Sequence, residues 1–135
     1  MHDFFDAEDW DDFANEALML LDRAEQLLLR AEKAGDLKPI MKELRRDFHT
    51  FKGNLMILEA DSMALMVHKL EDLLISPRIV KLEEGRLARL VDYLLSQLDF
   101  YRERIEKKHL EVEESELAKQ KLIIDVLTRD RSEKD

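Results

Sequence analysis

Residues 41–58 read MKELRRDFHTFKGNLMIL, a stretch in which a regular apolar pattern is interrupted by a compact polar group. Apolar side chains recur in it at spacings of three and four residues, the period of one buried face of an α-helix. The pattern predicts an amphipathic helix from about Pro39, which suits a first turn, to about Leu58. Its expected core positions are Met41, Leu44, Phe48, Phe51, Leu55 and Leu58.

The same period recurs before and after residues 41–58 and predicts four further helices. Capping and helix-breaking residues mark the ends of these helices. Their expected bounds are Asp6–Asp9 to Gly35 for the first helix, an Asp61 N-cap to Ser76-Pro77 for the third, Leu82 to His109 for the fourth and Glu114 to Thr128 for the fifth. The residues expected inward are Trp10, Phe13, Ala17, Leu21, Ala24, Leu28 and Ala31 in the first helix, Met63, Met66, Val67, Leu70, Leu73 and Leu74 in the third, Leu87, Leu90, Val91, Leu94, Leu98, Tyr101 and Ile105 in the fourth, and Leu117, Ile124 and Leu127 in the fifth.

Short connections between long amphipathic helices favour antiparallel neighbours. The sequence therefore predicts an all-α fold, an antiparallel up-down four-helix bundle with an additional C-terminal helix. One domain is expected over residues 1–128, followed by a charged, frayed tail at residues 129–135.

Composition limits the classes of function. The chain has 135 residues, 45% of them hydrophobic and 39% charged, with only three glycines and two prolines, which is typical of a helical globular protein. A net charge of −9 argues against a general nucleic-acid binder, and the lack of cysteine excludes disulfides, zinc–thiolate sites and thiol catalysis. No apolar stretch approaches the roughly 20 residues that span a bilayer, and the acidic N-terminus is unlike a secretory signal, so we expect a cytoplasmic protein.

The polar group in residues 41–58 has the pattern His49-x-x-Lys52-Gly53. His49 and Lys52 lie just off the apolar face and project to the same side, because they are three residues apart. A glycine inside a helix costs about 1 kcal/mol relative to alanine, so Gly53 requires a reason. Close approach of another molecule to the imidazole is one such reason.

A second polar pair, His68-x-x-Glu71, lies on one face of the next helix. If the two helices form an antiparallel hairpin with a turn near residues 59–61, His49 and Glu71 lie at nearly equal distances from that turn. Glu71 would then reach the imidazole and orient it as a nucleophile. With Lys52 to neutralise an anion and Arg45 and Arg46 to steer an acidic partner, the arrangement suits phosphoryl transfer.

The run His49-Thr50-Phe51-Lys52-Gly53, followed by His68-Lys69-Leu70-Glu71-Asp72-Leu73-Leu74, resembles histidine-containing phosphotransfer (HPt) domains, most of all the N-terminal phosphotransfer domain of the chemotaxis histidine kinase CheA. The resemblance implies that His49 is phosphorylated through Nε2, that Glu71 holds Nδ1, that Lys52 assists the phosphoryl group and that His68 completes the network. It implies a docking surface that includes Arg45, Arg46, Gly53 and Met56. Family members tend to have small residues after this glycine and a further glycine at the interhelical bend, where this chain has Met56 and Glu59.

The same resemblance implies a two-component pathway, with chemotaxis as the expected one. An ATP-binding histidine kinase domain would phosphorylate the chain, and an aspartate of a CheY-like response-regulator receiver domain would accept the group. Magnesium and ATP would be needed by those partner domains, with no cofactor bound by this one. The chain has no glycine-rich nucleotide loop, so it is not expected to be a kinase itself.

Two other interpretations of the sequence remain open. The bundle could be a non-catalytic helical protein-interaction module in which His49 is incidental. It could also be a metal-dependent bundle enzyme, but di-iron bundles need two Glu-x-x-His pairs, and this chain has one, Glu106-x-x-His109, beside two lysines. We therefore expect no metal site. The sequence does not decide between a free-standing protein and the first domain of a longer kinase.

Overall fold

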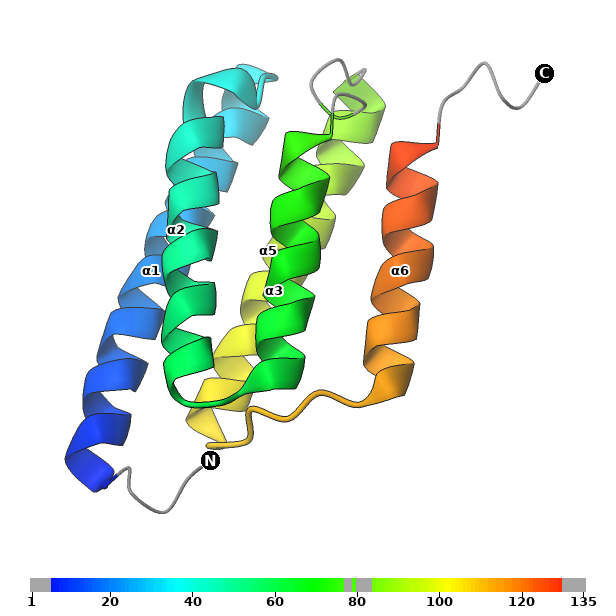
Figure 1. Ribbon diagram of the computed structural model, residues 1–135. Coiled ribbons are helices and arrows are strands. Elements are labelled where there is room, and N and C mark those ends of the chain that lie inside the picture. Colours follow the sequence, from blue (N-terminus) through cyan, green and yellow to red (C-terminus); the bar gives the residue numbers. More distant parts are fainter. Residues whose placement is uncertain (1–5, 77–78, 80–83, 130–135) are drawn as a thin grey trace.

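A computed structural model describes residues 6–76, 79 and 84–129 of the chain (Figure 1). Its helices are α1 (Ala7–Ala34), α2 (Lys38–Ile57), α3 (Asp61–Ile75), α5 (Glu84–Glu106) and α6 (Glu114–Thr128). Within these ranges there is no strand, so the predicted all-α class is confirmed. No helix in the same ranges is long and apolar enough to span a bilayer.

Helix α1 begins and ends where the sequence predicts, because both ends are capped. Asp6 and Asp9 form a reciprocal capping box, in which each backbone N–H donates to the other residue's carboxylate, at 2.8 and 3.2 Å. Gly35 ends the helix with φ 70°, a left-handed conformation that favours a residue without Cβ. The predicted bounds of this helix are therefore confirmed.

The turn between α2 and α3 corrects one prediction. Glu59 adopts φ 58°, and the backbone N–H of Ala60 donates to the carbonyl of Leu55 at 2.9 Å, so the chain reverses within three residues. Helix α3 then starts at Asp61, with Ala60 at the N-cap position and no side-chain cap. The predicted Asp61 N-cap is wrong, and the Asp61 carboxylate instead lies in the first turn, where the helix dipole favours a negative charge.

Helix α5 ends earlier than predicted, at Glu106 rather than His109, because Lys108 adopts a left-handed φ of 54°. The backbone N–H of His109 then donates to the carbonyl of Arg104 at 2.9 Å. Helix α3 ends at Ile75, followed by an extended Ser76, and α6 has the predicted bounds. Pro77, the predicted start of the fourth helix at Leu82, and tail residues 130–135 lie outside the described residues.

Successive helices run in alternating directions: α1 packs against α2 and α5, α2 packs against α3, and α6 lies beside α3 and α5 (Figure 1). Every predicted core position of α1, α3 and α5 is buried. Met41 and the three predicted inward residues of α6 are only partly buried. In α6 as described, the fully buried side chain is instead Gln120, whose Nε2 donates to the carbonyl of Met66 at 2.9 Å. Helix α6 is thus an outer layer. Helices α2 and α3 form the face that carries the motifs His49-x-x-Lys52-Gly53 and His68-x-x-Glu71.

Candidate functional site

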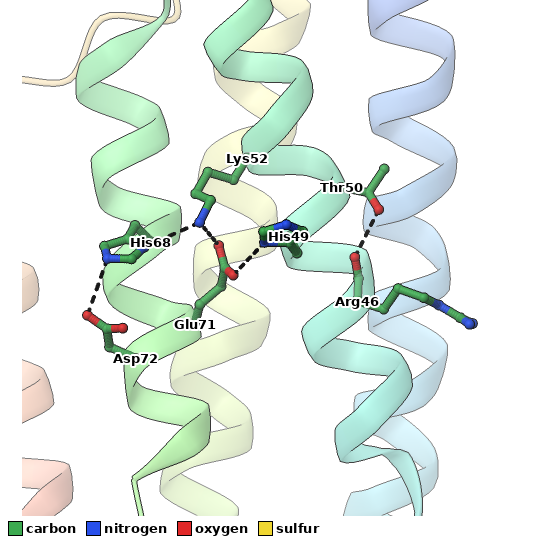
Figure 2. Close-up of polar contacts among 7 residues, drawn as sticks. All are labelled: Arg46, His49, Thr50, Lys52, His68, Glu71 and Asp72. Carbon is green, nitrogen blue, oxygen red and sulfur yellow. Dashed lines mark hydrogen bonds and ion pairs between the residues drawn. The ribbon is translucent and has the colours of Figure 1, made fainter.

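Helices α2 and α3 lie side by side and direct four polar side chains to one surface (Figures 1 and 2). His49 and Lys52 come from α2, whereas His68 and Glu71 come from α3. The buried residues Phe48, Phe51, Leu70 and Leu74 hold these two helices against the core. The polar residues therefore project from rigid helices rather than from loops.

His49 is the most accessible member of the group, with 72% of its side chain exposed. Its Nδ1 lies 3.1 Å from Oε2 of Glu71, which is only 17% exposed. An ionised carboxylate only accepts hydrogen bonds, so the contact places the ring proton on Nδ1 and leaves the lone pair on Nε2. In the described part of the chain Nε2 makes no hydrogen bond or ion pair, and with 72% of the side chain exposed it is open to an electrophile.

Lys52 links the two histidines through a chain of polar contacts (Figure 2). Its Nζ lies 2.8 Å from Oε1 of Glu71 and 3.3 Å from Nδ1 of His68. Only 15% of this side chain is exposed, so its ammonium group is held at the site rather than free in solvent. Glu71 thus binds one partner with each carboxylate oxygen, which fixes its orientation toward His49.

The charge state of Glu71 reflects these contacts. Burial raises the pKa of the carboxyl group, but hydrogen bonds from Lys52 and His49, with the positive charge of Lys52, outweigh burial and leave the pKa below its usual value of 4.5. Glu71 is therefore ionised at neutral pH, as its role as an acceptor requires.

The lowered pKa of Glu71 predicts a pH dependence of stability. A carboxyl group whose pKa is lower in the folded than in the unfolded chain stabilises the fold above its unfolded pKa, and this contribution is lost as pH falls through the folded pKa. We expect the free energy of unfolding to fall less steeply below about pH 4.5 in Glu71→Gln than in the unchanged chain. Urea unfolding at several acidic pH values measures this difference, and parallel curves would contradict it.

The remaining predicted site residues lie around His49 on α2. Arg45 and Arg46 are exposed one turn before it, and Met56 is exposed two turns after it. At Gly53 an added Cβ would meet no atom within 4 Å, so tight packing within the described chain does not explain this glycine. The open space beside Gly53 agrees with approach by another molecule.

One ion pair near the site was not predicted from the sequence. Asp47 is 2% exposed and accepts hydrogen bonds from Nε and Nη2 of Arg23, the Nε contact being 3.1 Å. The hydrogen bonds and the charge of Asp47 raise the pKa of Arg23. This bidentate pair joins α1 to α2 two residues before His49 and thereby helps to fix α2. The available signal was the position of Asp47, which lies three residues after Leu44 and four before Phe51 and so falls on the buried face.

The geometry thus presents a nucleophilic nitrogen, a carboxylate that orients it and an ammonium group that can neutralise an incoming anion. Searches of curated proteins and of solved structures gave no match. Residues 10–127, however, match the family model described as Hpt domain. Members of this family work with kinases and with response-regulator receiver domains in phosphorelays. The chain therefore belongs to the Hpt domain family, whose function is histidine phosphotransfer in two-component signalling.

Proposed function

We propose that the phosphoryl-accepting residue of this Hpt domain is His49, and that it reacts through Nε2. The observation that supports this most is the exposed imidazole whose Nδ1 is held at 3.1 Å by a largely buried carboxylate from the neighbouring helix. This contact stabilises one tautomer and increases the basicity of Nε2.

The proposed reaction has two balanced steps. In the first, the Nε2 lone pair attacks the γ-phosphorus of ATP held by a kinase domain, an N–P bond forms, the bond to the bridging oxygen breaks and ADP leaves. The proton remains on Nδ1, where the Glu71 carboxylate balances the positive charge of the ring. In the second, a carboxylate oxygen of a receiver aspartate attacks the same phosphorus and the N–P electron pair returns to Nε2. Lys52 neutralises charge on the phosphoryl oxygens in both steps.

We further propose a CheA-like place for the chain, in a chemotaxis pathway with a CheY-like receiver as acceptor. The two motifs, His49-x-x-Lys52-Gly53 and His68-x-x-Glu71, support this assignment through their resemblance to that kinase's phosphotransfer domain. ATP and magnesium would be held by the partner domains, and the need for ATP favours the cytoplasm. The alternating helices α1, α2, α3 and α5 support the expected four-helix bundle, with α6 as the additional helix.

The proposed docking surface surrounds His49 on α2. Arg45 and Arg46 place positive charge one turn before His49. After His49, Gly53 leaves open space beside the helix, and Met56 exposes an apolar side chain. A partner domain that brings phosphorus to Nε2 covers this surface. Steric and electrostatic changes here should therefore alter transfer more than folding.

Substitution of Gly53 by glutamine separates these two effects. Glutamine is the better helix former, so we expect the free energy of unfolding to rise by up to about 1 kcal/mol. The longer side chain enters the space that the partner needs, so we expect phosphoryl transfer to slow by about tenfold. Urea unfolding and the rate of labelling measure the two quantities on the same protein. An unchanged rate of transfer would show that no partner approaches Gly53.

A labelling experiment tests the proposed activity. The chain is incubated with the ATP-binding domain of a chemotaxis histidine kinase, magnesium and γ-labelled ATP, and the label is then exposed to acid and to base. We expect a label that is lost in acid and retained in base, and that moves to a CheY-like receiver when the receiver is added. No label, with partner binding retained, would favour a non-catalytic interaction module.

A further inference from the structure

His68 lies between two groups of opposite charge, one at each ring nitrogen (Figure 2). Nδ1 is 3.3 Å from the ammonium nitrogen of Lys52, on α2. Nε2 is 3.6 Å from Oδ2 of Asp72, one turn further along α3. The second distance is that of an electrostatic contact rather than of a hydrogen bond. Asp72 is therefore a further member of the chain of polar contacts that runs from His49 through Glu71 and Lys52 to His68.

The two contacts require the same tautomer of His68. An ammonium group has only donors, so Nδ1 must carry a lone pair to bind Lys52. The ring proton then resides on Nε2, which faces the acceptor-only carboxylate of Asp72. If the proton moved to Nδ1, a donor would face the ammonium group of Lys52 and a lone pair would face the carboxylate of Asp72. Both contacts would then be repulsive.

We propose that Asp72 is a positioning residue, which acts through His68 to hold Lys52 in place for phosphoryl transfer. This inference rests on the proposed function of His49. Asp72 favours the His68 tautomer with a proton on Nε2, and His68 in turn provides the second acceptor that fixes the Lys52 ammonium group. Lys52 also binds Glu71 at 2.8 Å. The position of the Lys52 ammonium group therefore affects the orientation of the carboxylate that holds His49.

The expected effect of removing the charge of Asp72 is modest, because both His68 and Asp72 are largely exposed. The side chains of His68 and Asp72 are 50% and 61% exposed, so solvent screens their attraction. We expect Asp72→Asn to slow phosphoryl transfer to and from His49 by about two- to fivefold. The substitution keeps the shape of the side chain and removes its charge, so packing is unchanged.

The experiment combines the tautomer of His68 with the rate of transfer. Nitrogen-15 NMR of the whole chain, in mildly alkaline buffer, distinguishes protonated from unprotonated ring nitrogens. For the unchanged chain we expect an unprotonated Nδ1 and a protonated Nε2 at His68. In Asp72→Asn we expect the two shifts to move toward those of a mixture of tautomers, together with the slower transfer. Asp72→Glu, which restores a carboxylate, should recover both readouts.

Asp125→Asn is the matched control. Asp125 is exposed on α6 and lines the same surface groove between α3 and α6 as Asp72, so the substitution removes an equal charge from that groove. It should alter neither the tautomer nor the rate. In a His68→Ala background, Asp72→Asn should likewise leave the rate unchanged.

Three results would overturn the inference: an unchanged His68 spectrum in Asp72→Asn, an equal loss of rate in Asp125→Asn, or an undiminished effect of Asp72→Asn without His68. Failure of the proposed function is a separate outcome, since the unchanged chain would then take no label, or His49→Gln would keep it.

Discussion

His49→Gln is expected to abolish phosphoryl labelling of the chain. Glutamine keeps a polar side chain at this position but has no nucleophilic lone pair that can form a stable N–P bond. Neighbouring groups do not replace the imidazole, because Lys52 is engaged with Glu71 and His68, and Nδ1 of His68 faces the ammonium group of Lys52. We therefore expect a complete loss of label rather than a reduced rate.

The fold should not change in this variant. Because 72% of the His49 side chain is exposed, we expect the free energy of unfolding to shift by no more than about 0.5 kcal/mol. His68→Gln is the matched control, with the same change three contacts further along the polar chain, beyond Glu71 and Lys52, and it should retain label at a lower rate. Equal labelling of His49→Gln and the unchanged chain would place the phosphoryl group elsewhere.

Glu71→Ala should have the second largest effect, a fall of about 10- to 100-fold in the rate of phosphorylation. The substitution removes the acceptor from Nδ1 of His49, so the ring can rotate, change tautomer and lose basicity at Nε2. Lys52 also loses its closest partner, at 2.8 Å. Rapid-quench labelling measures the rate directly.

Stability should be less affected than rate in this variant. Glu71 is partly exposed, so we expect a loss of about 1–2 kcal/mol, which leaves the fold intact. Glu106→Ala, the same change at the exposed end of α5, should alter neither quantity. A normal rate in Glu71→Ala would mean that this carboxylate does not orient His49.

The proximity of His49 and Glu71 was predictable because it follows from the geometry of two antiparallel helices. Both residues lie at nearly equal distances from the α2–α3 turn, and the rise per residue is the same in each helix. The buried face of α2 was also predictable, since Leu44, Phe48 and Phe51 repeat with the helical period.

The turns were less predictable because they depend on residues in unusual conformations. Glu59 and Lys108 adopt positive φ values, which sequence patterns associate with glycine, and these residues shift the start of α3 and the end of α5. Gly35, whose residue type matches its left-handed φ, marks its helix end correctly. Local sequence thus predicts a helix end where residue type and conformation agree.

Buried polar groups formed the other class of missed features. The partners of Asp47 and Gln120 lie 24 and 54 residues away in sequence, at Arg23 and at the carbonyl of Met66. Periodicity alone can show that such a residue faces inward, but the partner depends on how helices pack. The site around His49 was accessible from sequence because two short motifs, His49-x-x-Lys52-Gly53 and His68-x-x-Glu71, mark its residues, whereas no such motif marks Asp47 or Gln120.

Phosphorus-31 and nitrogen-15 NMR of the phosphorylated chain identifies the atom that carries the phosphoryl group, and so decides whether His49 reacts through Nε2. We expect a phosphorus–nitrogen coupling to Nε2 of His49, with Nδ1 still protonated and facing Glu71. A coupling to Nδ1 of His49, or to either nitrogen of His68, would contradict it.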